Sequence, residues 1–382
     1  MPATLIRNAH VYAPEDLGVN DVLIANGKFL AVGKDLNVVL PKLETIDAKG
    51  KILTPGFFDQ HIHVTGGGGE GGPVSRTPEL VLSELVACGT TSVVGVSGTD
   101  FITRSIENLL AKVRALSAEG ASTWMYTSCY HYPPVSMSES AAKDMFMVPE
   151  CLGVKIALGD HRSSFPTIDQ LIQLLADIRL AGMISGKIGV LHIHSGNLEG
   201  EFEMFREVVR RGFPIRHIRP THCARKEHVF KGAVEFAKAG GYIDITTGGS
   251  CCFKSPAEAI MTALGEGVDP ARITISSDGH GSKPRFNEKG EMVGLAVCGI
   301  ECNLETIQKL FREYGQPLER ILPFITKNVA DSHGLGCQGR VAEGACANAL
   351  LFDPDLTLTD VFSKGRQMMR EKEIIVKGTF EE

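Results

Sequence analysis

The stretch FFDQHIHV, residues 57–64, marks the point at which the pattern of the chain changes. Before it, short apolar segments that alternate like β-strands follow one another between turns, and Asn26–Gly27 predicts a two-residue hairpin turn. From Pro55 onward, short apolar runs alternate instead with segments of helical periodicity. The residues from this stretch onward are therefore expected to form an α/β domain.

Eight apolar runs of strand length follow this pattern, and FFDQHIHV is the first. The others are TSVVGVSG (91–98), ASTWMYTSCY (121–130), VKIALGD (154–160), GVLHIHSG (189–196), IRPTHC (218–223), YIDITTGG (242–249) and ITISSDG (273–279). Helical stretches lie between most of them, for example TPELVLSELVACG (77–89), for which Thr77 is the predicted N-cap. Eight strand–helix units over this length predict a TIM barrel, in which residues at the carboxyl ends of the strands form the active site.

The two ends of the chain both read as short strands separated by turns. In the C-terminal part, Asp353–Pro354 and Lys364–Gly365 are the turn signals. We therefore expect residues 1–54 and 340–382 to join in a small β-sandwich domain beside a barrel domain of residues 55–339.

Composition and charge exclude several classes of protein. The 382 residues are 43% hydrophobic and 22% charged, as in an ordinary globular protein. A formal net charge of −6 leaves no basic excess to neutralise phosphates, so no nucleic-acid partner is expected. No apolar stretch is long enough to span a bilayer, so no membrane partner is expected either. The absence of a leader pattern, with ten cysteines that form no CxxC pair and are expected to be mostly buried thiols, favours a cytoplasmic location.

Two histidines in the first run are candidate metal ligands. Asp59, His61 and His63 are spaced by two, so on a strand their side chains lie on one face and the imidazoles can converge on one ion. The same spacing also occurs in surface strands. Here it stands at the predicted rim of a barrel and leads into the glycine-rich GGGGEGG, which favours a metal site.

Lys155 lies inside the otherwise apolar VKIAL, where an unpaired ammonium group is costly. One interpretation is that it pairs with Asp160 or extends to solvent. The other is that its neutral amine is carboxylated by carbon dioxide, which would make it a ligand that bridges two cations.

The remaining candidate ligands end later runs. His194 is the expected ligand in GVLHIHSG, with His192 as a core or supporting group, and His222 and Asp278 end the sixth and eighth runs. Together with His61, His63 and Lys155 they fit a binuclear metal site.

The order HxH, Lys, His, His, Asp resembles the amidohydrolase superfamily over nearly the whole chain. Finer motifs resemble its isoaspartyl dipeptidase family: HIHVTGGGGEGGP, SGTD, CYHYP, VKIALGDHRS, THCAR and SSDGHGS. One departure is Asn348, which stands where the superfamily usually has an acidic residue; we expect it to affect packing of the sandwich and not the site.

The resemblance implies a role for each residue. Two zinc ions would be held by His61, His63, His194, His222 and Asp278 and bridged by carboxylated Lys155. Asp278 would accept a proton from a metal-bridging hydroxide and pass it to the leaving amine, while Tyr130 polarises the carbonyl. The substrate-binding residues would be Glu70, Thr99, Tyr130, Arg162, Arg225 and Ser282. A homo-octamer is also implied.

The implied substrate agrees with the charges of these residues. An isoaspartyl dipeptide carries an α-ammonium and an α-carboxylate on one residue, so its binding requires an acid, such as Glu70, beside guanidinium groups. Two alternatives stay open: a cyclic-amide hydrolase of the dihydropyrimidinase or hydantoinase kind, and a non-catalytic assembly protein that kept the barrel.

Overall fold

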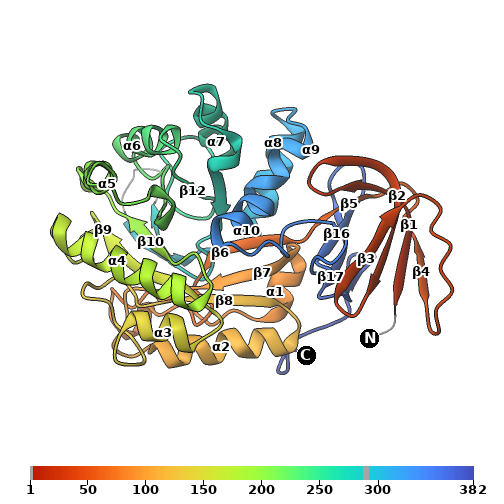
Figure 1. The fold of residues 1–382 in the computed structure, drawn as a ribbon, viewed down its shortest axis with the longest axis horizontal. Helices are drawn as coiled ribbons and strands as arrows, with labels where there is room; N and C mark the ends of the chain where they lie inside the picture. The colour runs from red at the N-terminus through yellow and green to blue at the C-terminus, as the bar shows by residue number, and fades with distance from the viewer. Residues whose placement is uncertain (1–2, 287–291) are drawn as a thin grey trace.

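The computed structural model describes residues 3–286 and 292–382, and Figure 1 shows a larger α/β part beside a sheet built from both parts of the chain that flank it. Among the described residues of the α/β part, one strand corresponds to each of the eight predicted apolar runs. These strands are β6 (Phe57–Ile62), β7 (Thr90–Gly95), β8 (Ser122–Thr127), β9 (Cys151–Leu158), β10 (Val190–Ser195), β11 (Ile218–Thr221), β12 (Ile243–Thr246) and β13 (Ile273–Ser276). Almost all of their residues are buried, which explains why they read as apolar runs and not as alternating ones.

These strands form a barrel-like parallel sheet in sequence order. β6 to β11 make one six-stranded ladder, and β12 and β13 make a separate pair. Backbone hydrogen bonds bridge both seams: Cys223 N donates to Asp244 O (3.0 Å), and His63 N donates to Gly279 O (2.9 Å). The predicted α/β class is confirmed, while among the described residues the ladder is continuous around only part of the ring.

Helices cover the outside of this sheet. They are α1 (Leu82–Ala87), α2 (Ile106–Glu119), α3 (Ala141–Met147), α4 (Ile168–Ser185), α5 (Glu201–Arg210), α6 (Glu227–Lys238), α7 (Pro256–Gly265), α8 (Cys302–Arg312), α9 (Leu318–Ile321) and α10 (Lys327–His333). The predicted N-cap at Thr77 is wrong, because α1 begins five residues later and the Thr77 hydroxyl instead contacts Gly67 and His280.

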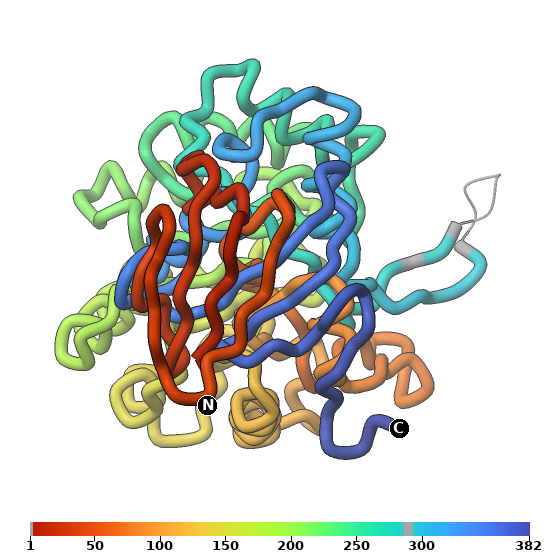
Figure 2. The backbone as a smooth tube through the Cα atoms, turned by 90° about the vertical axis from the view of Figure 1, so that its right-hand side faces the viewer, coloured from red at the N-terminus to blue at the C-terminus, as the bar shows by residue number. Residues whose placement is uncertain are grey.

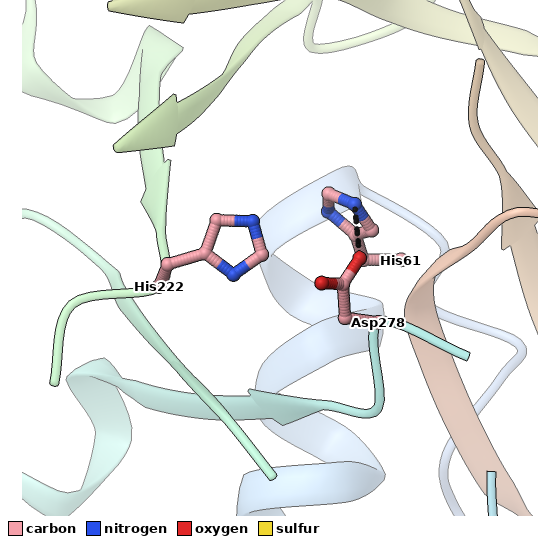
Figure 3. A group of neighbouring side chains, drawn as sticks. All are labelled: His61, His222 and Asp278. Atoms are coloured by element: carbon pink, nitrogen blue, oxygen red, sulfur yellow. Dashed lines mark ion pairs between the residues drawn. The ribbon is translucent and has the colours of Figure 1, made fainter. Parts of the chain in front are cut away.

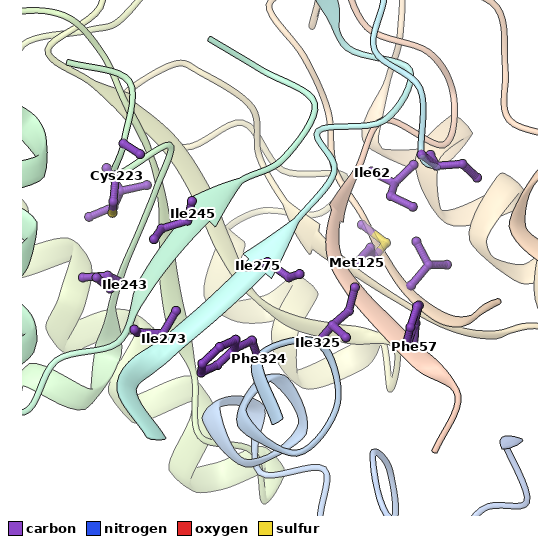
Figure 4. Packing of buried hydrophobic residues seen from close by; sticks show 14 of the residues in the cluster. Phe57, Ile62, Met125, Cys223, Ile243, Ile245, Ile273, Ile275, Phe324 and Ile325 are labelled. Atoms are coloured by element: carbon purple, nitrogen blue, oxygen red, sulfur yellow. The ribbon is translucent and has the colours of Figure 1, made fainter. Parts of the chain in front are cut away.

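The core of the α/β part continues beneath the strands. Figure 4 shows Ile273 and Ile275 of β13 with Phe324 and Ile325, which belong to a short 3₁₀ helix, η4 (Leu322–Ile325), and Phe57 of β6 nearby. This packing holds the amino ends of the strands together, so that their carboxyl ends can carry polar side chains.

The other sheet has nine strands. They are β1 (Thr4–Tyr12), β2 (Asp16–Ala25), β3 (Lys28–Gly33), β4 (Glu44–Asp47), β5 (Ile52–Pro55), β16 (Ala349–Phe352), β17 (Leu358–Ser363), β18 (Arg366–Arg370) and β19 (Glu373–Ile374). The order is β19-β18-β17-β16-β5-β1-β2-β3, with β4 beside β1. The two flanking parts of the chain therefore join as expected, through β5 and β16, but the described strands belong to one sheet and a sandwich of two sheets is not confirmed.

A hairpin of β14 (Ser282–Phe286) and β15 (Met292–Val297) projects from the body, as Figure 2 shows. Among the described residues no helix is long and apolar enough to cross a membrane. Of the ten cysteines, all free, only five are buried, so the expectation of mostly buried thiols is too strong.

Candidate active site

His61, His222 and Asp278 form the centre of the site. Each offers one ligand atom within 4.8 Å of the others, and Figure 3 shows His222 facing the other two side chains from a different strand end. His222 and Asp278 both have left-handed backbone angles, with φ of 60° and 57°. Such angles are unfavourable for residues with a Cβ and commonly occur at functional sites.

The other predicted ligands adjoin this centre. His63 Nε2 lies 3.2 Å from Asp278 Oδ1, to which His61 Nε2 is also close at 3.3 Å. The ring of His194 lies 4.5 Å from that of His222. All four imidazoles are almost fully buried.

Lys155 is fully buried and its amine reaches the centre. Its Nζ donates to Ser97 O (2.9 Å) and lies 3.2 Å from His61 Nε2. The alternative pairing with Asp160 is not what the structure shows. Burial lowers the pKa of Lys155 to about 7, so that a neutral amine is available near neutral pH.

The electrostatics of the centre favour neutral imidazoles, the form that binds metals. Burial, with the nearby Lys155 amine, lowers the pKa of His61 to about 3. Burial and Arg225 hold the pKa of His222 well below its usual value. Burial alone would raise the pKa of Asp278, but His222 and the hydrogen bonds from His61 and His63 outweigh it and keep this carboxyl ionised.

One buried nitrogen atom, Nε2 of His222, favours the interpretation that this centre binds a metal ion. His222 Nδ1 is hydrogen-bonded to Thr246 Oγ1 (2.7 Å), while its Nε2 has no partner among the described residues. A buried polar atom without a partner is unfavourable unless a ligand completes it. Nitrogen and carboxylate donors are those that zinc prefers, so the residues present fit a divalent metal.

A pocket opens beside this centre and contains most of the predicted substrate-binding residues. Its lining is His63, Gly68, Gly98, Thr99, Tyr130, Arg162, His194, Arg225, Asp278, Gly281 and Ser282. Glu70 stands next to it: its Oε1 accepts a hydrogen bond from Ser282 Oγ (2.5 Å) and lies 3.4 Å from Arg162 Nη1. The structure thus brings all of the predicted site residues into one connected region.

Tyr130 links the pocket to the histidines. Its hydroxyl lies 2.8 Å from His194 Nδ1, and the guanidinium of Arg162 packs over its ring at 5.2 Å. Burial raises the pKa of Tyr130, so the hydroxyl keeps its proton and can act as a donor.

Two residues support the site from behind the predicted ligands, and only one of them was expected from the sequence. His192 was expected as a core or supporting group, and its Nε2 lies 2.7 Å from His61 Nδ1. Asp160 was not expected in the site, yet its buried carboxylate contacts Arg162 and His194. Its place two residues after β9, at the rim, is the signal that could have identified it.

Comparison with known proteins assigns this arrangement to a class. The amidohydrolase family model matches residues 52–379. A dihydroorotase of Listeria monocytogenes serotype 4a (strain HCC23) is 22% identical over 424 residues, covering 95% of this chain and 92% of that protein. The chain belongs to the amidohydrolase family and is a metal-dependent hydrolase.

Within the class, the similarity to one kind of enzyme is much stronger. The crystal structure of the β-aspartyl dipeptidase from Fervidobacterium islandicum AW-1, in complex with the β-Asp-Leu dipeptide, is 39% identical with a TM-score of 0.90, covering 97% of this chain and 98% of that one. The dihydropyrimidinase of Brevibacillus agri NCHU1002 is 17% identical with a TM-score of 0.70, covering 98% of this chain and 96% of that one, which shows a shared fold alone. The family in question is therefore that of the β-aspartyl dipeptidases.

Proposed function

We propose that this protein is a binuclear-metal isoaspartyl dipeptidase, which hydrolyses the β-linked amide bond of isoaspartyl dipeptides. The observation that carries the substrate assignment is the position of Glu70, 3.4 Å from Arg162, at a pocket lined by Tyr130 and Asp278. An acid and a guanidinium side by side match the α-ammonium and α-carboxylate of one isoaspartyl residue. The similarity to an enzyme crystallised with β-Asp-Leu supports the same substrate class.

The metal assignment goes with this proposal. His61, His63 and Asp278 would hold one zinc ion, His194 and His222 the other, and carboxylated Lys155 would bridge them. When bound, the ions would lower the pKa of a water molecule and polarise the scissile carbonyl. Domain boundaries at 1–54 with 340–382 and at 55–339, a closed (β/α)₈ barrel, and a homo-octamer belong to the same proposal.

The protein's own residues supply the remaining chemistry. Asp278, kept ionised by its imidazole neighbours, would accept a proton from the attacking water and deliver it to the departing amine. The Tyr130 hydroxyl would donate to the carbonyl oxygen as negative charge develops there. Glu70, Thr99, Arg162, Arg225 and Ser282 would hold the charged groups of the dipeptide.

Three substrates assayed side by side test the proposal. We expect turnover of β-Asp-Leu, with α-Asp-Leu and dihydrouracil slower by at least ~100-fold, since neither presents both charged groups of an isoaspartyl residue in the same geometry. Preferred turnover of dihydrouracil would instead assign the chain to the cyclic-amide hydrolases. Fewer than one metal ion per chain, without turnover of any substrate, would favour the assembly-protein alternative.

A further inference from the structure

The buried carboxylate of Asp160 lies where the substrate pocket meets the histidine cluster. Asp160 follows β9 by two residues, and its side chain is 2% exposed. Both of its carboxylate oxygens contact neighbouring guanidinium or imidazole groups. Oδ1 accepts from Arg162 Nε (2.8 Å), Oδ2 accepts from Arg162 Nη2 (2.9 Å), and Oδ2 also lies 3.1 Å from His194 Nε2 and 3.6 Å from Arg225 Nη1.

The paired contact with Arg162 fixes the plane of its guanidinium. Two parallel N–H···O bonds define both the direction and the tilt of a planar group, which a single contact does not. The face of that plane packs on the ring of Tyr130, with 5.2 Å between the guanidinium carbon and the ring centre. The only guanidinium nitrogen of Arg162 that Asp160 leaves unused is Nη1, which points to Glu70.

Arg225, which follows β11 in the chain, lies close to the same carboxylate. Its Nη1 lies 3.0 Å from His194 Nε2 as well as 3.6 Å from Asp160 Oδ2. Two guanidinium groups in one pocket repel each other, and a buried negative charge between them offsets that repulsion. Both oxygens of Asp160 accept a hydrogen bond from the Arg162 guanidinium, which is the paired arrangement of an ionised carboxylate with an arginine.

We propose that Asp160 is a positioning residue that orients Arg162 and Arg225 for a substrate carboxylate, and that it thereby sets the preference for dipeptides with free carboxylates over amidated ones. The proposal rests on the proposed function. Arginines already held in their binding orientation lose less side-chain freedom when the substrate arrives, which strengthens binding of the group that they receive.

The test compares β-Asp-Leu with its two monoamides, one lacking the α-carboxylate and the other lacking the C-terminal carboxylate. Asp160→Asn keeps the shape of the side chain but loses its charge and one acceptor. We expect kcat/KM for β-Asp-Leu to fall ~10–100-fold, the range for a lost hydrogen bond to a charged group. For the monoamide that lacks the carboxylate received by the arginines, the fall should be less than ~3-fold, because the affected interaction is already missing.

This comparison separates the arginines from the metal centre. Asp160 also contacts His194, and a change in metal binding would slow all three substrates by the same factor; metal content per chain is measured in parallel. An equal loss for β-Asp-Leu and both monoamides overturns the proposal. If wild-type protein does not hydrolyse β-Asp-Leu, it is the proposed function that fails.

Two further variants keep the test interpretable. Asp160→Glu retains the charge but moves it by one methylene group, and should show the same selective loss if Asp160→Asn does not fold. Asp21→Asn is the matched control, because Asp21 is also buried and also binds an arginine, with 2.8 Å from Arg7 Nη1 to its Oδ2, but in the nine-stranded sheet. We expect Asp21→Asn to leave the ratio of activities on the three substrates unchanged.

Discussion

At the scale of single residues, Glu201 shows how burial changes an acid that no predicted role requires. It is the first residue of α5 and only 4% exposed, and neither carboxylate oxygen has a hydrogen-bond partner among the described residues. Its Oε2 occupies the space that a Cβ on Gly159 would need, at 2.7 Å. Burial raises the pKa of Glu201 from 4.5 to about 7, so the folded protein holds a proton that an unfolded chain releases.

The pH dependence of stability follows from that difference. As pH rises from 4.5 to about 7, the free energy of unfolding should fall, because the unfolded chain gains by releasing the proton first. Glu201→Gln should remove this decline. The free energy of unfolding of the variant should equal that of wild type at low pH and exceed it above pH 7 by about 3 kcal/mol at most. Urea unfolding at several pH values measures it. Glu203→Gln, an exposed position on the same helix, is the control, and parallel curves for Glu201→Gln and wild type would contradict the prediction.

At the scale of elements, the contact between β9 and β10 positions much of the candidate site. β9 carries Lys155 and leads to Asp160, while β10 carries His192 and His194. The two strands pair in parallel, with Gly153 opposite Val190. A Cβ on Gly153 would lie 2.0 Å from Val190 O, so the close approach of these backbones requires glycine.

A methyl group at this position should force the two strands apart. We expect Gly153→Ala to lower the free energy of unfolding by about 1–3 kcal/mol, the usual cost of overpacking, and to lower metal content per chain. Gly265→Ala, at the end of α7, is the control, because no atom lies within 4 Å of the place that its new methyl group would take. Denaturant unfolding and metal analysis of both variants measure the effect, and equal stability of the two would show that the strands tolerate the methyl group.

At the scale of the whole molecule, Asn348 joins the nine-stranded sheet to the barrel-like one. Its amide nitrogen donates to Ser92 Oγ at 3.2 Å, to Ser122 Oγ at 3.2 Å and to Gln338 Oε1 at 2.9 Å, and its oxygen accepts from Lys364 N at 2.8 Å. This position was expected to affect packing of the sandwich and not the site, and its contacts also reach the barrel-like sheet, because Ser92 and Ser122 belong to β7 and β8.

Replacing this donor should weaken the connection. Asn348→Asp would place a buried acceptor against the acceptor Gln338 Oε1, and we expect the free energy of unfolding to fall by about 1–3 kcal/mol. The exposed Asn108→Asp, in the first turn of α2, is the control, since a negative charge there is tolerated or favourable. Thermal and urea unfolding measure both. An unchanged midpoint for Asn348→Asp would mean that the residues around it rearrange to donate.

Local patterns were sufficient to predict the eight strands and to place candidate ligands at their ends, because each of these features depends on neighbours in the sequence. His61 and His63 share a face through the two-residue period of a strand, and Asn26–Gly27 has the positive φ values, 52° and 73°, of the predicted turn. Contacts between distant segments were not predictable in this way. Asp160 meets His194 and Asn348 meets Ser92 only after the strands are placed, and the single nine-stranded sheet depends on which strands pair.

The pairing of β5 with β16 also determines the order in which the strands of this sheet can pair while the chain is being synthesised. Pro55 lies opposite Ala349, so the edge of β5 that receives β16 stays uncovered until nearly three hundred further residues have left the ribosome. β1, β2 and β3 can pair early as hairpins, since their contacts are local. During that interval the open edge of β5 can pair with other chains, so this topology exposes the growing protein to aggregation until β16 has been made.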